Sequence, residues 1–133
     1  MACCSFLLAA DSPAVEKAQA RLSDLKGLSA VGAVSARQVE QAEIALAQAR
    51  EDQLIDETVY GELAIDELTE AQATAMKTAA QRRLDRERAK LADAAKLVSA
   101  GVSPRSSLIP FEDDVDRARR ILSAAEERAR ALT

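Results

Sequence analysis

Hydrophobic residues recur three and four positions apart along most of this chain, the spacing that places them on one face of an α-helix. The longest run lies at the C-terminal end, where steps of three and four alternate without interruption. Its members are Leu108, Phe111, Val115, Ala118, Leu122, Ala125, Ala129 and Leu132. Such a run is typical of a helix that packs along a coiled-coil seam. No segment shows the strict alternation of a half-buried strand.

Three shorter stripes with the same spacing predict three further helices. The stripes are Val15, Ala18, Leu22 and Leu25; then Val39, Ala42, Leu46 and Ala49; then Ala73, Met76, Ala80, Leu84, Leu91, Ala94 and Val98. The second stripe changes face near Arg50, where the heptad register slips. We therefore predict helices over about 12–31, 36–60, 69–100 and 107–132.

Serine and threonine residues mark the starts of these helices. Ser35 lies three residues before Gln38, and Thr69 three residues before Gln72. Both pairs match the capping box, in which each side chain bonds the other residue's main-chain N–H. Ser12 precedes a proline, which is favoured in the first turn. Three helix starts are thus predicted from local chemistry.

Glycines mark the ends of two helices. Gly32 and Gly101 follow the first and third stripes, where a left-handed residue ends a helix. Pro110 would disrupt a helix interior, but a cap at Ser106 or Ser107 places it in or beside the first turn. We therefore predict short reversals at 32–35 and 101–107.

The two reversals belong to a duplicated unit. A helix, a glycine turn, a serine and an apolar stripe recur about 70 residues apart, with roughly seven extra residues, SSLIPFE, in the second copy. We predict an all-α fold of antiparallel coiled-coil hairpins, forming an up-down-up-down four-helix bundle over 12–133. Residues 1–11 are predicted to be a leader-like or disordered N-terminus.

Composition argues against catalysis within these 133 residues. The chain has no histidine, which removes the commonest general base and metal ligand. Cys3 and Cys4 are adjacent and complete neither a disulfide framework nor a zinc site. The acidic residues at 112–116 open a helix, where they complement its dipole, rather than forming a calcium loop. We predict no enzyme, no cofactor and no metal.

The charged run RRLDRERAK at 82–90 raises the question of nucleic-acid binding. Five of its residues are basic, but no aromatic residue accompanies them for base stacking, and the chain has a net charge of −4. We therefore predict a solvated face or a partner-helix surface and no nucleic acid. No segment reaches the ~20 apolar residues of a membrane span.

The opening MACCSFLLAADSPA has a short apolar stretch followed by small residues, without the positive start of a secretory signal. We expect a periplasmic or secreted protein if a signal peptide has been clipped, and a cytoplasmic one otherwise.

Two segments carry a family resemblance. GAVSARQVEQAEIALAQARE (32–51) resembles the helical hairpin of periplasmic adaptor (membrane fusion) proteins of tripartite efflux and secretion systems. AKLVSAGVSPRSSL and DDVDRARRIL resemble the duplicated coiled-coil hairpins of TolC-type outer-membrane efflux proteins. Both families contain β-rich parts that this chain lacks, so a stand-alone or truncated helical module is expected.

In those families the hairpin tips contact a partner protein. The resemblance therefore implies partner contacts at Ser35, Arg37, Ser103 and Arg105, although helix capping alone also accounts for the serines. We expect a protein partner or self-association through the helices, including a homodimer. The alternative is an N-terminal helical spacer of a larger secreted cell-wall enzyme.

Overall fold

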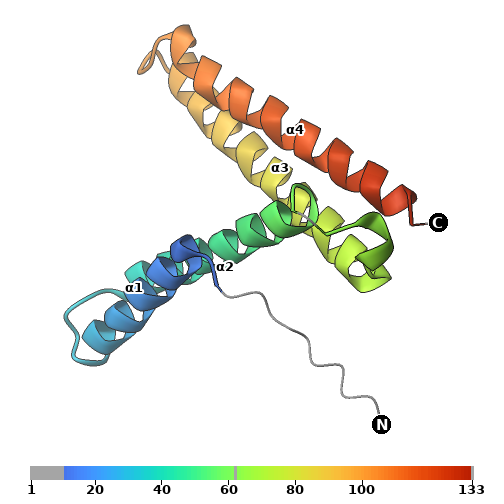
Figure 1. The fold of residues 1–133 in the computed structure, drawn as a ribbon. Coiled ribbons are helices and arrows are strands. Elements are labelled where there is room, and N and C mark those ends of the chain that lie inside the picture. The colour runs from blue at the N-terminus through green and yellow to red at the C-terminus, as the bar shows by residue number, and fades with distance from the viewer. Residues whose placement is uncertain (1–10, 62, 133) are drawn as a thin grey trace. The chain divides into compact units, whose positions relative to one another are not determined.

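The computed structural model describes residues 11–61 and 63–132, and all regular structure in these ranges is helical (Figure 1). The predictions for the N-terminal leader and for the two cysteines concern residues that lie almost entirely outside them. The elements are α1 (Pro13–Ala30), α2 (Ala36–Thr58), η1 (Ile65–Glu67), α3 (Glu70–Ser99), η2 (Arg105–Leu108) and α4 (Ile109–Arg130). The predicted all-α fold is confirmed.

The chain divides into two compact units, Met1–Gln53 and Leu54–Thr133. Packing joins helices that are neighbours in the sequence, α1 with α2 in the first unit and α3 with α4 in the second, as the predicted antiparallel order requires (Figure 1). The boundary falls within α2, close to the predicted slip at Arg50. Ile55 and Val59 accordingly belong to the core of the second unit.

The first unit is a two-helix hairpin with a narrow core. Its buried and half-buried residues are those of the first two predicted stripes: Val15, Leu22, Ala42 and Leu46 within, and Ala18, Leu25, Val39 and Ala49 beside them. The Ser12 N–H donates to Gln53 Oε1 (2.9 Å) and joins the open end of the hairpin. An exposed ion pair between Lys26 and Glu43 (4.0 Å) adds little, since such pairs contribute ~0–1 kcal/mol.

The second unit has the larger core. One cluster joins the end of α2, the connector, α3 and α4 through Ile55, Val59, Leu68, Ala73, Met76, Ala79, Ala80, Ile121 and Ala125. A second cluster of Leu84, Val115 and Ala118 continues along α3 and α4. Within α3 and α4, two buried residues, Ala79 and Ile121, lie outside the predicted stripes, whereas Leu122, which lies within one, is half-buried.

A hydrogen bond from α4 helps to hold the connector between α2 and α3. The Arg128 guanidinium of α4 donates to the Leu63 carbonyl oxygen (2.5 Å). Leu68, at the end of the connector, is buried in the core. The predicted capping box then starts α3: the Gln72 N–H donates to Thr69 Oγ1 (3.1 Å), and the Thr69 N–H donates to Gln72 Oε1 (3.0 Å).

Candidate interaction surface at the hairpin tips

The first hairpin turns at Gly32, whose φ of 74° lies in the left-handed region. The Gly32 N–H donates to the Ser29 carbonyl oxygen (3.0 Å), and the Ala33 N–H donates to the Leu28 carbonyl oxygen (2.9 Å). These two bonds define a Schellman motif, which satisfies the last carbonyl groups of α1.

Ser35 then starts α2 as predicted. The Gln38 N–H donates to Ser35 Oγ (3.3 Å), and the Ser35 N–H donates to Gln38 Oε1 (2.9 Å), so the capping box is complete. Arg37, in the first turn of α2, is exposed and has no hydrogen-bond or ion-pair partner among the described residues. Of the two residues predicted here, Ser35 is occupied with helix capping and Arg37 is available for contact.

The second hairpin repeats the same turn at Gly101, whose φ is 75°. The Gly101 N–H donates to the Val98 carbonyl oxygen (3.0 Å), and the Val102 N–H donates to the Leu97 carbonyl oxygen (2.9 Å). The two turns therefore share the same pattern of main-chain hydrogen bonds.

The chain after the second turn differs from the prediction. Ser107 Oγ donates to the Pro104 carbonyl oxygen (2.6 Å) inside the 3-10 helix η2, and α4 begins only at Ile109. The residue that caps α4 is Leu108, without a side-chain hydrogen bond, so the predicted cap at Ser106 or Ser107 is wrong. Pro104, in an extended conformation, precedes the separate short helix η2, and its carbonyl oxygen accepts the Ser107 hydroxyl. Pro110 nonetheless lies in the first turn of α4.

The other two predicted contact residues lie in this second tip. Ser103 is half-buried beside the apolar tip surface and caps no helix. Arg105 is exposed at the start of η2 and, within the described part of the chain, makes no hydrogen bond or ion pair. Each hairpin tip thus carries an exposed arginine, Arg37 or Arg105, that has no partner among the residues the structure describes.

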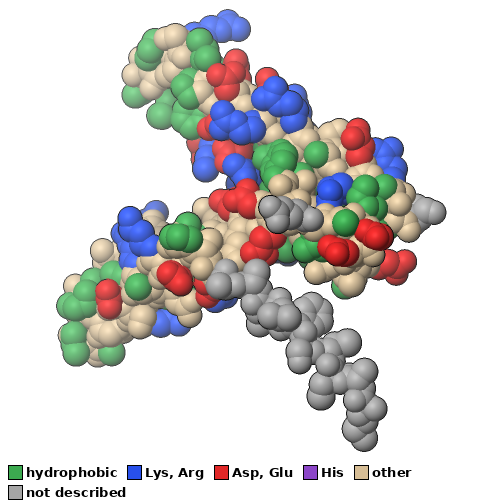
Figure 2. Space-filling model, viewed as in Figure 1, with side chains coloured by type: hydrophobic (Ala, Val, Ile, Leu, Met, Phe, Trp, Pro, Cys, Tyr) green, Lys and Arg blue, Asp and Glu red, His purple; other side chains and the backbone are tan. Residues whose placement is uncertain are grey.

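Exposed aliphatic side chains are the feature of the tips that the sequence analysis missed. Among the described residues, five of the eight exposed large hydrophobic side chains lie at the tips. They are Leu28 and Val31 in the first hairpin, and Leu97, Val102 and Ile109 in the second. Figure 2 shows hydrophobic side chains gathered at the end of each hairpin. A sequence signal was present, since a leucine stands four residues before each turn glycine.

The second tip also contains a hollow of about 460 Å³. Ala94 and Leu97 of α3 and Phe111 of α4 supply its apolar lining, Ser103 and Ser107 come from the turn, and Lys90 and Asp93 provide its charged residues. Ser107 and Phe111 both belong to the SSLIPFE segment that the first hairpin lacks.

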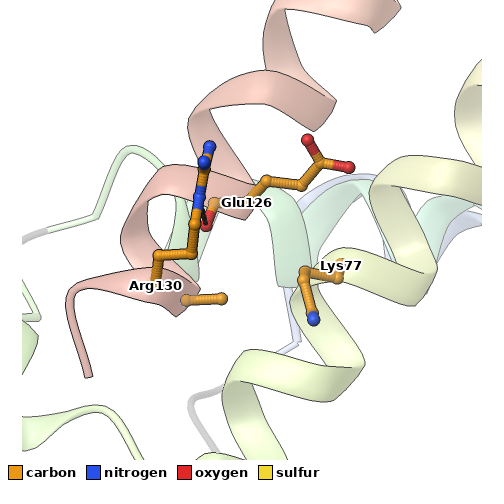
Figure 3. Close-up of a pocket in the computed structure, with 4 residues that line it drawn as sticks. Lys77, Glu126 and Arg130 are labelled. Carbon is orange, nitrogen blue, oxygen red and sulfur yellow. Dashed lines mark hydrogen bonds between the residues drawn. The ribbon is translucent and has the colours of Figure 1, made fainter. Parts of the chain in front are cut away.

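A second hollow of about 460 Å³ lies between α3 and α4, away from the tip. It is lined by Lys77, Glu126, Ala129 and Arg130 (Figure 3). Figure 3 shows the Lys77 ammonium and the Glu126 carboxylate pointing in different directions, while Arg130 Nε donates to the Glu126 main-chain oxygen (3.4 Å). The hollow is open and mixes both signs of charge, so it selects no ligand class.

The predicted basic run lies on α3, where part of its charge is paired locally. Lys90 Nζ lies 3.4 Å from Glu87 Oε1. Over residues 11–61 and 63–132, no group of three His, Cys, Asp or Glu side chains could hold a metal ion. Among the described residues, no helix combines the length and the hydropathy that a membrane span requires.

Comparison of this chain with models of protein families, with curated proteins and with solved structures gave no match.

Proposed function

We propose that this chain is a non-catalytic protein-interaction module that contacts a partner protein through the tips of its two helical hairpins. The observation that carries the proposal is the concentration of exposed aliphatic side chains at both tips. The family resemblance of these segments supports the same role, that of a coiled-coil, efflux-like hairpin acting in the periplasm.

Exposure of this kind is unfavourable unless something covers it. Val31 and Val102 are 77% and 71% exposed, although both lie next to a turn where a polar residue would fit equally well. Clustered exposed apolar residues with a polar surround are typical of protein-contact sites. The tips therefore favour contact over a purely structural spacer.

The tip arginines provide the polar part of such a contact. Arg37 and Arg105 are exposed and, within the described residues, unpaired. Arginine is enriched in interface centres because its planar guanidinium binds carboxylates with two hydrogen bonds. We propose that each arginine pairs with a carboxylate of the partner beside the aliphatic contact.

Site-specific photo-crosslinking in the cells that produce the protein tests the proposal. A photoreactive residue at Val31 or Val102 is expected to capture a protein partner, and one at Ile44, which is 51% exposed on the body of α2, is expected not to. Equal capture from Ile44, or no capture from either tip, would contradict the proposal.

The arginines are tested in the same system. We expect the double variant Arg37→Ala, Arg105→Ala to reduce the capture from Val31 and Val102 by about tenfold, because hydrogen bonds to charged groups contribute ~1.5–3 kcal/mol. The matched control is Arg88→Ala, which removes an exposed arginine from the middle of α3. Unchanged capture in the double variant would leave the arginines without a role.

A further inference from the structure

The tip of the α3–α4 hairpin combines a hollow with exposed aliphatic side chains at neighbouring positions of the chain. We propose that this tip is a self-complementary surface on which a second copy of the chain docks through the same residues. The inference builds on the proposed role of the tips as contact surfaces, but it concerns the second tip alone and names its occupant.

Shape is the first argument for a second copy. Val102 and Ile109 project from the tip, 71% and 56% exposed, beside the hollow formed by Ala94, Leu97 and Phe111. A contact between two identical surfaces related by a two-fold axis requires each surface to carry both a projection and a recess. This tip carries both.

Charge is the second argument. Lys90 and Asp93 lie on the same hollow, one turn of α3 apart and opposite in sign. A two-fold axis between two copies would bring Lys90 of each copy opposite Asp93 of the other, giving two ion pairs from one pair of residues. Charge patterns of this kind set the register and the partner of an interface.

The ion pairs that Lys90 and Asp93 form within α3 do not prevent these residues from pairing with a second copy. Lys90 pairs with Glu87 (3.4 Å) and Asp93 with Lys96 (3.5 Å), each within α3. The Asp93 and Lys96 side chains are 79% and 78% exposed, and an exposed pair one turn apart contributes only a few tenths of a kcal/mol, so Asp93 can change its partner at little cost. Glu87 is only 14% exposed, but Lys90 is 56% exposed, and its ammonium group has further donors for a second carboxylate while it keeps Glu87.

The extra segment of the second hairpin provides the third argument. Ser107 and Phe111 line the hollow, and Ile109 projects beside it, and all three belong to SSLIPFE. In a chain with 2% aromatic residues, one of them lies half-buried in this hollow. Aromatic residues are enriched among the anchors of protein interfaces. The segment thus adds apolar side chains to the tip that neither the turn nor the start of α4 requires.

The contact should be weak, because a hairpin tip buries less than the ~1,200 Å² typical of stable complexes. Sedimentation equilibrium of the purified full chain from roughly 10 µM to 1 mM should therefore show reversible dimerisation. The variant Val102→Glu should abolish it, since a carboxylate cannot enter the hollow without losing its hydration.

Charge reversal gives the decisive test. Lys90→Glu places a carboxylate opposite Asp93 twice, and Asp93→Lys places an ammonium group opposite Lys90 twice, so each variant alone should dimerise about tenfold more weakly than the wild type. An equimolar mixture of the two variants should regain the wild-type association as a heterodimer, because one variant is then acidic and the other basic at both positions, so that both opposed pairs join a carboxylate to an ammonium group. Lys77→Glu, a charge reversal on α3 away from the tip, should leave dimerisation unchanged.

A wild-type chain that stays monomeric at all these concentrations would overturn the proposal. So would charge-reversed variants that dimerise as well as the wild type, or a mixture that associates no better than its components. These outcomes leave the proposed function standing, because capture of a different protein from Val31 in the first tip is measured separately.

Discussion

The glycine of each hairpin turn has a φ near +75°, a region that other residues enter at a cost of about 1–2 kcal/mol. Gly32→Ala should therefore lower the free energy of unfolding by about that amount. Gly27, an exposed residue inside α1 where an added Cβ would meet no neighbouring atom, provides the matched control. Gly27→Ala should instead raise the free energy by up to about 1 kcal/mol, because alanine has the higher helix propensity. Urea denaturation of both variants measures the difference. An equal loss of stability in both would contradict the left-handed conformation of Gly32 as the cause.

The two serines that the sequence places at equivalent points of the turns should respond differently to substitution. Ser35→Ala removes the hydroxyl that accepts the Gln38 N–H and should lower the free energy of unfolding by about 1 kcal/mol. Ser103 caps no helix, so Ser103→Ala should change it by less than about 0.5 kcal/mol. Denaturation in dilute protein makes the comparison, and similar losses would mean that the repeat preserves capping as well as turn geometry.

At the scale of the helices, Ile121 is the most informative position on α4. It is 4% exposed and lies in the main core cluster of the second unit. Ile121→Ala should lower the free energy of unfolding by about 2–5 kcal/mol, through lost transfer energy and the cavity left behind. The same substitution at Ile109, which is 56% exposed on the same helix, should have an effect below about 0.5 kcal/mol. Thermal or urea unfolding at low protein concentration measures both; comparable losses would show that α4 packs in a different register.

The helix starts at Ser12, Ser35 and Thr69 could be predicted because capping depends on residues three positions apart. The burial of Ile121 could not be predicted, because a strict spacing of three and four residues defines only one narrow stripe. The buried face of α4 is wider than that stripe, since α4 packs against α3 and also contacts the connector. The cap at Ser107 failed for a similar reason: Pro104 starts a competing 3-10 helix that uses the hydroxyl. The tip hollow depends on where Phe111 packs, which no local pattern specifies.

At the scale of the whole molecule, the two units differ in the size of the hydrophobic core that each contains. Among the residues that the structure describes, four buried residues form the core of the first unit, whereas nine form the main cluster of the second. Because local opening is easiest where few apolar contacts are lost, amides in the middle of α1 should exchange with solvent at least about tenfold faster than those in the middle of α3. Hydrogen exchange followed by mass spectrometry measures this, and equal or greater protection in α1 would contradict it.

The Schellman turns have an evolutionary consequence. Their main-chain bonds close each hairpin without using any tip side-chain atom. Mutations at Val31 or Val102 can therefore change what a tip recognises while leaving the folding of the hairpin intact. A hairpin closed in this way can change the sequence of its tip, and can accept extra residues directly after the turn, without altering the packing of its two helices.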